Sequence, residues 1–284
     1  MKNTLSFKDL TILLISYYSS KDIIRIIKKI DRKIKIIIIE NAQEEGFKSK
    51  FSNFKNVKIV FSKNNLGQVG GMNLGLKKIK TRHALYMDPD VNFKKTIIDN
   101  FLKIAYQVKD FVILAPQHEK SRYTNDFKSN RNNEHKNLDL MKMVHGHFLF
   151  FNMNVVRKIG GYDKKIWMYY DETDFCLRAY RKRQKIYVIP YLNVEHRGGS
   201  SIKSGKNLKI EAHHNWHYMW SKFYFFKKNY STFEGYKKTV NDLIISILKF
   251  LIFLIVNKRK RVIYQNRVCG LLCSYLGIKS YKRL

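Results

Sequence analysis

The chain has 284 residues, and 55 Lys and Arg against 22 Asp and Glu give it a formal net charge of +33. Hydrophobic residues make up 45% of it, which supports a substantial core and excludes wholesale disorder. Its three cysteines, at positions 176, 269 and 273, exclude a disulfide framework, and one C-x3-C pair is a poor zinc signature. This cysteine usage fits a reducing cytoplasm best.

The basic residues are spread along the whole chain rather than gathered in one segment. Basic surfaces attract polyanions, but no helix-turn-helix, RNP or zinc-finger pattern is present, so we expect no specific nucleic-acid partner. Two interpretations stay open. The charge reflects compositional drift that leaves a solvated basic face, or it attracts an anionic membrane surface or a phosphate-rich substrate.

The first 20 residues contain a short apolar stretch with no small-residue cleavage site after it, which does not fit a signal peptide. The longest apolar run, from Leu243 to Val256, has 14 residues and is interrupted by Ser246 and Lys249. A bilayer span needs about 20 residues. We therefore expect the chain to be soluble or to lie on a membrane surface.

Strands and helices alternate in the predicted N-terminal half. Short β-branched runs predict strands, and Ile at helical spacing after Ser20 predicts a helix over 20–30. The predicted strands cover residues 10–17, 34–39, 57–61 and 83–87, and a Gly-rich turn at 64–76 leads into another helix. This alternation is typical of an α/β fold with a mostly parallel sheet covered on both faces. Ligands of such sheets bind at the carboxyl ends of strands, where Glu40, Asp88 and Asp90 stand.

The C-terminal half begins with a polar, Asn- and Lys-rich loop over 117–142. Strands are predicted at 145–151 and 185–190, and a helix that starts near Asp171 lies between them. From residue 203 onward the pattern is helical and rich in aromatic residues. The sequence therefore predicts a helical extension after the α/β region.

Asp88-Pro89-Asp90 follows a predicted buried strand. In an extended segment, residues i and i+2 point the same way, so both carboxylates can face one divalent cation. Hard oxygen ligands suit Mg²⁺ or Mn²⁺, and such an ion can bind a diphosphate. The alternative is an ordinary Asp-Pro turn after a strand.

Two further positions carry possible chemistry. Asp171 and Glu172 open a predicted helix, where a carboxylate can take a proton from an attacking hydroxyl or can simply favour the helix N-terminus. Asp174 and Arg178, four residues apart, can pair with each other. His196 ends a predicted strand and can be a third metal ligand or an ordinary histidine, and Gly198-Gly199 after it allows a mobile loop over phosphates.

Other motifs are assigned no cofactor. The Gly-rich stretch 67–75 matches neither a P-loop nor a clean G-x-G-x-x-G pattern. We assign no metal to His145, His147, His213, His214 or His217. His213 and His217 are four residues apart, but the glutamate of an HEXXH site is absent.

Taken in order, these segments resemble family 2 glycosyltransferases with the GT-A fold, in particular the rhamnosyltransferase-like enzymes of bacterial surface polysaccharide assembly. The resemblance runs from about residue 10 to 220. The matching segments are ISYYSS (15–20), IIIIENA (36–42), NNLGQVGGMNLGL (64–76), YMDPDV (86–91), the strand around Gly146, GGYDKKIWMYYDETDFCLR (160–178) and VIPYLNVEHRGGSS (188–201). The last two are the most specific, whereas D-x-D alone is common.

The resemblance implies a GT-A catalytic domain over residues 1–205, with a nucleotide-sugar half at about 1–115 and an acceptor half at about 116–205. Residues 206–284 would form a basic, helical tail. Two departures from the family pattern matter. Asp171-Glu172 stands where the family usually has Glu-Asp, so Glu172 is the expected base and Asp171 the alternative. Glu40 stands where the family prefers Asp.

The resemblance implies inverting, single-displacement transfer from a nucleoside-diphosphate sugar. Mn²⁺ or Mg²⁺ would be held chiefly by Asp90, with Asp88 and His196 assisting. The expected nucleotide-sugar contacts are Ser16, Tyr17, Glu40, Asn65, Gly67 and Asp88, and the expected acceptor contacts are Gly146, Trp167 and Tyr169. Core packing is the alternative role of the two aromatic acceptor residues.

The family implies a glycan or lipid-linked glycan acceptor, in polysaccharide or lipopolysaccharide synthesis at the cytoplasmic face of the inner membrane. The donor sugar is not fixed by the sequence, and rhamnose is one choice. An apolar segment at 241–256 followed by basic residues 258–261 fits a membrane-surface helix, and the alternatives are packing on the catalytic domain or in a homodimer.

Two other functions fit parts of the sequence. The charge and the tail also fit a non-catalytic protein that binds membranes or polyanions. A sugar nucleotidyltransferase on a related fold is disfavoured by the late His196-Gly-Gly segment and by the absence of a G-x-G-rich N-terminal loop.

Overall fold

A computed structural model of the protein describes residues 6–118, 125–197 and 207–283. These residues form two compact units. The first, here called the α/β unit, comprises Met1–Asn64, Gly71–Tyr162 and Phe175–Ile202; the second, the helical unit, comprises Asn65–Gly70, Asp163–Asp174 and Lys203–Leu284. The expected domain boundary at 205 and the Gly198-Gly199 pair lie outside the described residues.

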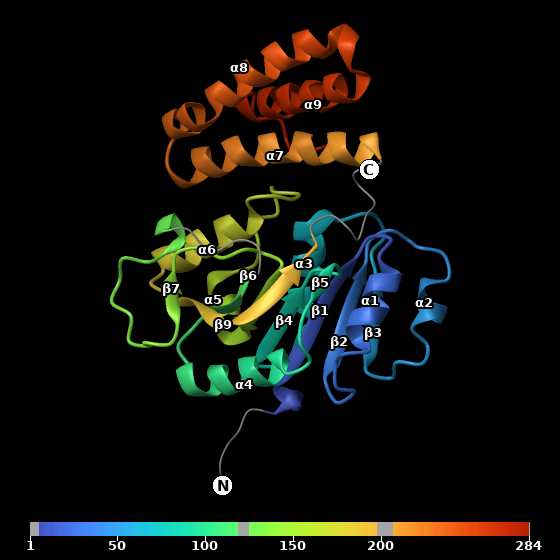
Figure 1. The fold of residues 1–284 in the computed structure, drawn as a ribbon, viewed down its shortest axis with the longest axis vertical. Helices are drawn as coiled ribbons and strands as arrows, with labels where there is room; N and C mark the ends of the chain where they lie inside the picture. The colour runs from blue at the N-terminus through green and yellow to red at the C-terminus, as the bar shows by residue number, and fades with distance from the viewer. Residues whose placement is uncertain (1–5, 119–124, 198–206, 284) are drawn as a thin grey trace. The chain divides into compact units, whose positions relative to one another are not determined.

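The elements alternate through the α/β unit and become purely helical after β9 (Figure 1). In chain order they are η1 (Phe7–Asp9), β1 (Leu10–Ser16), α1 (Ser20–Ile27), β2 (Lys35–Glu40), α2 (Phe47–Lys50), β3 (Val57–Phe61), α3 (Gly67–Lys78), β4 (His83–Met87), β5 (Val91–Asn92), α4 (Ile97–Val108), β6 (Ile113–His118), η2 (Asn125–Phe127), β7 (Asp139–Met141), β8 (Phe148–Asn152), α5 (Met153–Ile159), α6 (Asp171–Arg181), β9 (Ile186–His196), α7 (Leu208–Asn229), α8 (Thr232–Val256) and α9 (Lys258–Tyr275).

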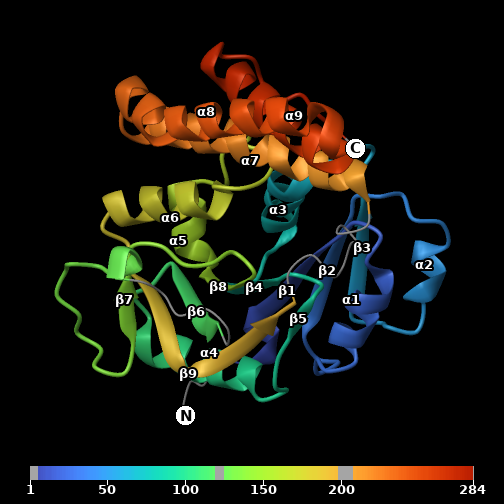
Figure 2. The same cartoon turned by 45° about the horizontal axis from the view of Figure 1, so that its top comes forward.

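The sheet has the order β3-β2-β1-β4-β8-β6-β9-β5, and β7 pairs with β9 (Figure 2). The first four strands are parallel to one another, which confirms the strands predicted from the Ile-rich runs. β8 lies between β4 and β6 and runs antiparallel to both. Because β8 is antiparallel to both, β6 and β9 run in the same direction as β1 to β4, and only β5, β7 and β8 are reversed. The sheet is therefore mostly parallel, as the sequence predicts.

β9 extends to His196, whereas the predicted strand ended at residue 190, and it pairs with three other strands. It pairs in parallel with β6 and antiparallel with β7 and β5. The register with β6 shifts where Pro116 pairs with Ile189 and Gln117 pairs with Asn193. β9 residues 190–192 therefore form an irregular segment, after which His196 pairs with Val91 of β5.

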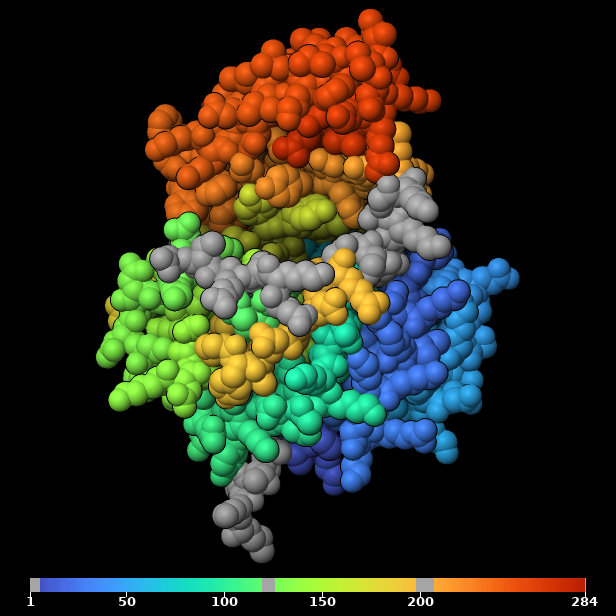
Figure 3. Space-filling model, in the orientation of Figure 1, coloured from blue at the N-terminus to red at the C-terminus, as the bar shows by residue number. Residues whose placement is uncertain are grey.

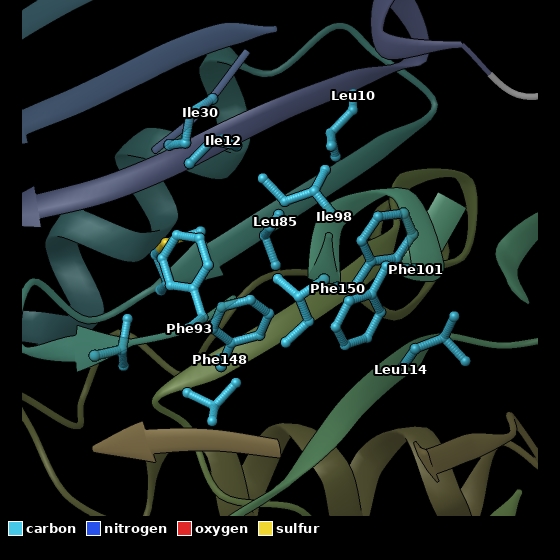
Figure 4. Close-up of a cluster of buried hydrophobic side chains, with 14 of the residues drawn as sticks. Leu10, Ile12, Ile30, Leu85, Phe93, Ile98, Phe101, Leu114, Phe148 and Phe150 are labelled. Atoms are coloured by element: carbon cyan, nitrogen blue, oxygen red, sulfur yellow. The ribbon is translucent and has the colours of Figure 1, made fainter. Parts of the chain in front are cut away.

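Helices cover both faces of the sheet, as the sequence predicts. Successive strand side chains point to opposite faces, so Leu10, Ile12 and Leu14 of β1 join the core under α1 and α4. Phe101 of α4 stacks on Phe150 of β8 in this core, with ring centroids 5.5 Å apart (Figure 4). On the opposite face α3 lies close to β1, since a Cβ at Gly75 would lie 2.3 Å from the Leu13 side chain.

In the helical unit, α7, α8 and α9 lie side by side (Figures 1 and 2). Trp216, Trp220 and Cys273 form one buried cluster between α7 and α9, and Met219, Phe223 and Leu271 form another. Gly270 permits the close approach of α9 to α7, because a Cβ there would lie 2.2 Å from the Trp216 backbone oxygen.

α8 is the one helix among the described residues that is long and apolar enough to cross a membrane, by length and composition only. It has 25 residues, and 11% of its most apolar stretch is buried. The apolar run from Leu243 to Val256 covers only the last 14 residues of this helix, because α8 begins at Thr232. In the space-filling view, α8 side chains lie along one surface of the helical unit (Figure 3).

Replacing Gly270 by Ala tests the α7–α9 contact. Ala raises helix propensity, but its methyl group overlaps backbone, which cannot rotate away, so we expect a net loss of about 1–3 kcal/mol in the free energy of unfolding. All three tryptophans belong to the helical unit, so urea unfolding followed by tryptophan fluorescence reports this unit. Gln265→Ala, on the exposed surface of α9, is the control. Equal midpoints for the two variants would contradict the tight contact.

Candidate active site

The α/β unit brings together the three predicted metal ligands. Asp88 and Asp90 follow β4, and His196 ends β9 opposite Val91. His196 Nε2 lies 3.0 Å from Asp90 Oδ1 and 3.5 Å from Asp88 Oδ2. One potential ligand atom from each residue lies within 4.8 Å of the others. Two carboxylates after β4 and one imidazole at the end of β9 therefore form a site that can hold a divalent ion.

Neighbouring groups fix these ligands. The Asp88 N–H donates to the His147 carbonyl at 2.9 Å, and the Tyr86 hydroxyl donates to the Asp88 carboxylate. Asp90 is buried. Burial alone would lower the pKa of His196, but its hydrogen bond to Asp90 and the charges of Asp88 and Asp90 raise that pKa above its usual value. A proton and a metal ion therefore compete for the imidazole, since only neutral imidazole binds metal.

Three predicted nucleotide-binding residues lie at the ends of β1 and β2, where Ser16 pairs with Glu40. Glu40 is fully buried, and its two oxygens accept the Ala42 N–H at 2.8 Å and the Gln43 N–H at 2.7 Å. Its carboxylate thus shapes the loop after β2. Contact of Glu40 with a nucleotide stays a prediction.

Ser16 and Tyr17 lie at the neighbouring strand end. The Ser16 and Ser19 hydroxyls are 3.2 Å apart, and the Tyr17 ring meets Tyr18 edge to face at 5.0 Å. Tyr18 was not predicted as a site residue. It is 60% exposed at a φ of 52°, and its place in the matching segment ISYYSS (15–20) beside Tyr17 is the sequence signal that points to it.

Asn65 and Gly67 belong to the helical unit. Asn65 Oδ1 accepts the Gly67 N–H at 2.9 Å. Gly67 has a φ of 67°, and a Cβ there would lie 2.5 Å from the Trp167 ring, so glycine is required for both conformation and space. Their role toward a nucleotide sugar stays a prediction.

The predicted bases, Asp171 and Glu172, open α6 and also belong to the helical unit. Asp171 is buried and Glu172 half-buried. Burial raises the pKa of Glu172, which brings its basicity nearer to that of an effective general base at neutral pH. The catalytic role of either residue stays a prediction.

Asp174, in the first turn of α6, has a structural role, which is the alternative to catalysis for an acidic residue at a helix start. It is fully buried and accepts hydrogen bonds from Lys228 Nζ at 2.6 Å and from Asn229 Nδ2 at 3.0 Å. Arg178, its expected partner, donates to the Gly161 carbonyl at 2.7 Å. Asp174 therefore fastens the first turn of α6 to the end of α7.

The acceptor residues are divided between the units. Gly146 lies in the α/β unit just before β8, whereas Trp167 and Tyr169 belong to the helical unit. Trp167 is buried, with the Arg283 guanidinium 3.6 Å from its ring centroid, which favours the core-packing alternative. Tyr169 has a φ of 64°, and burial raises the pKa of its hydroxyl to about 12.

His213 and His217 of α7 contact residues 280–282. His217 Nε2 lies 2.9 Å and His213 Nε2 3.3 Å from the Lys282 carbonyl, and the Ser280 hydroxyl lies 3.1 Å from His217 Nδ1. Their i, i+4 spacing therefore serves packing within the helical unit.

Comparisons with known proteins identify the family of the chain. The family model "Glycosyl transferase family 2" matches residues 11–160. The low-salt glycan biosynthesis hexosyltransferase Agl10 of Haloferax volcanii is 21% identical over 197 residues, which are 63% of this chain and 64% of that protein. The chain thus spans a little under two thirds of this curated relative.

Solved structures share the fold at low identity. The mannosyltransferase PcManGT of Pyrobaculum calidifontis, in complex with GDP-Man and Mn²⁺, has a TM-score of 0.57 at 10% identity, over 95% of this chain and 86% of that one. GalNAc-T7 with UDP, GalNAc and Mn²⁺ has a TM-score of 0.56 at 13% identity, over 86% and 58%. TarS 1–349 of S. aureus with UDP has a TM-score of 0.55 at 12% identity, over 96% and 93%. The predicted GT-A fold is confirmed.

Replacing Lys228 by Met tests the ion pair between Lys228 and the buried Asp174. The change leaves the Asp174 carboxylate buried without its cation, so we expect a loss of about 2–4 kcal/mol in the free energy of unfolding at pH 7. Lys227→Met, at the exposed neighbouring position, should change it by less than about 0.5 kcal/mol. Tryptophan fluorescence during urea unfolding measures both variants, and equal losses would contradict the assignment.

The same variant has a pH signature. Burial alone would raise the pKa of Asp163, but hydrogen bonds from Lys228, the Lys165 N–H and Tyr224 lower it. A depressed carboxyl pKa stabilises the fold above the unfolded value of about 3.9, and this stabilisation is lost as the pH falls through the folded value. Lys228→Met should therefore lose less stability than the wild type between pH 5 and pH 3, as measured by the same unfolding experiment.

Proposed function

Because the chain belongs to glycosyl transferase family 2, we propose that it moves a sugar from a nucleoside-diphosphate sugar to a hydroxyl of a glycan or lipid-linked glycan. The observation that carries this proposal is the cluster of Asp88, Asp90 and His196 at the carboxyl ends of β4 and β9. The name of the Haloferax relative, a glycan biosynthesis hexosyltransferase, supports it.

Two carboxylates and one imidazole fit Mn²⁺ or Mg²⁺, with Asp90 as the main ligand and Asp88 and His196 assisting. When bound, such an ion supplies charge neutralisation for the departing nucleoside diphosphate. Tyr86 and the His147 carbonyl hold Asp88 in place before any ligand arrives. The side chains are thus preorganised, which lowers the cost of arranging them during the reaction.

The proposed transfer is inverting and occurs in a single displacement. Glu172, or Asp171 in its place, takes the proton of the acceptor hydroxyl, and the hydroxyl oxygen forms a bond to the anomeric carbon. The bond from that carbon to the diphosphate oxygen breaks on the opposite face, so one displacement inverts the configuration. The raised pKa of Glu172 supports its role as the proton acceptor.

Ser16, Tyr17 and Glu40 at the ends of β1 and β2 would contact the nucleotide, and Asn65 and Gly67 would contact the donor from the loop before α3. Gly146 and Tyr169 would contact the acceptor. Rhamnosyl transfer in bacterial polysaccharide or lipopolysaccharide synthesis is the finer form of the proposal, and it rests on the sequence resemblance.

A panel of nucleotide sugars, with Mn²⁺ or Mg²⁺ and after chelation, tests the activity. We expect donor hydrolysis or transfer that requires the ion, and a decrease in kcat of about 10²–10⁴-fold in Glu172→Gln, as for loss of a general base. Asp90→Asn should raise the Mn²⁺ concentration needed for half-maximal activity, and Asp99→Asn, which changes an exposed carboxylate on α4, is the control. Folded Asp90→Asn and Glu172→Gln proteins with full turnover would overturn the site.

We propose further that the protein works at the cytoplasmic face of the inner membrane and binds anionic lipid through α8. Apolar side chains of α8 are exposed over its last four turns: Ile244, Ile245, Ile247, Leu248, Leu251, Ile252, Leu254, Ile255 and Val256. Four basic residues, 258–261, follow at once. An exposed apolar face next to cationic side chains fits a lipid surface, where each Lys or Arg adds about 1 kcal/mol.

Vesicle co-sedimentation tests this site. We expect binding to vesicles with anionic lipid, little binding to neutral vesicles, and a loss of at least about tenfold for Leu251→Glu or Ile255→Glu. Phe233→Glu, at an exposed position in the first turn of the same helix, is the matched control. Unchanged vesicle binding in the two α8 variants, with a dimer converted to a monomer in light scattering, would favour the homodimer alternative.

A further inference from the structure

Four imidazoles lie close together at the end of the sheet where Asp88, Asp90 and His196 form the candidate metal site. β4, β6 and β9 end at this edge and β8 begins there, because β8 is antiparallel to β4 and β6. His118 is the last residue of β6 and His196 the last of β9, and His145 and His147 precede β8. The sheet topology thus gathers histidines that are far apart in the sequence.

The rings are close enough to share ligands. His147 stacks on His196 with centroids 4.8 Å apart and planes at 4°. The centroid of His147 lies 5.0 Å from that of His118 and 6.0 Å from that of His145, and His118 and His145 are 6.4 Å apart. Three imidazoles that bind one tetrahedral ion through bonds of about 2.1 Å place their centroids roughly 5 Å apart. Small side-chain rotations therefore bring His118, His145 and His147 to one ion.

His147 provides an independent indication of a ligand. It is 7% exposed, and its Nε2 atom has no hydrogen-bond partner within the part of the chain that the structure describes. Burying a polar nitrogen without a partner costs free energy, so such an atom calls for an explanation. A metal ion bound at Nε2 would supply that missing partner.

We propose that His118, His145 and His147 form a second cation site, selective for a divalent transition metal that prefers nitrogen ligands, such as Zn²⁺. It differs from the neighbouring site in chemistry, because Asp88 and Asp90 supply hard oxygen ligands that suit Mn²⁺ or Mg²⁺. The stacked rings of His147 and His196 connect the two sites. Two dications so close repel each other, so an ion in the imidazole site weakens Mn²⁺ binding at the carboxylates.

Titration of the metal-free full chain with Co²⁺, followed by displacement with Zn²⁺, tests the proposal. Nitrogen-ligated tetrahedral Co²⁺ has strong visible absorption, which an oxygen-rich octahedral site lacks. We expect this absorption in the wild type and in Asp90→Asn. It should weaken, with at least about a tenfold loss of Co²⁺ affinity, in His145→Asn and His118→Asn. His135→Asn, outside the cluster, is the control.

His145 and His118 are half-buried and come from different segments, so their variants keep the test valid if a His147 variant does not fold. Identical titrations for wild type, His145→Asn and His118→Asn would overturn the second site, as would loss of the absorption in Asp90→Asn. The test does not depend on the proposed sugar transfer. An inactive protein that shows the imidazole-dependent absorption would still retain this site.

Discussion

The arrangement of the α/β unit depends on how two like-charged carboxylates are held next to each other. Asp88 and Asp90 would repel if they were alone, and Asp90 is almost inaccessible to water. His196 offsets this repulsion through its contacts with both. A divalent ion would do the same with twice the charge. His196 thus lies where it contacts both carboxylates, and their charges raise the pKa of its imidazole.

The structure also explains which features local sequence patterns could predict. Runs such as 34–39 contain β-branched residues with no competing helical period, so β1 to β4 and the position of Asp88 and Asp90 followed directly. The reversed direction of β8 did not, because it depends on where the long polar excursion returns. His145 and His147 were assigned no metal on local spacing, whereas their proximity to His118 and His196 arises from strand pairing. The roles of Glu172 and Asp171 remain predictions, because the spacing of residues in the sequence does not give the distance between these carboxylates and the metal ligands.

The helical unit shows that part of the basic composition has a packing role. Lys228 neutralises Asp163 and Asp174, and Arg283 lies over the Trp167 ring. Both cations act on groups in the segment 163–174, which also contains the proposed base. Trp167, one of the two aromatic residues that suggested an acceptor surface, is held by the Arg283 contact. A buried aromatic side chain near a predicted site can therefore serve rigidity rather than recognition.

The irregular segment of β9 has a consequence for how the protein can evolve. Residues 190–192 determine which side chain of β9 arrives opposite Val91 and beside Asp90. Deleting one residue there would bring Arg197 to that position, and inserting one would bring Glu195. The first cannot ligate a cation and the second adds a third negative charge to the pair. We therefore expect length changes in this short stretch to be strongly selected against, and substitutions of its exposed residues, Pro190 and Tyr191, to be better tolerated.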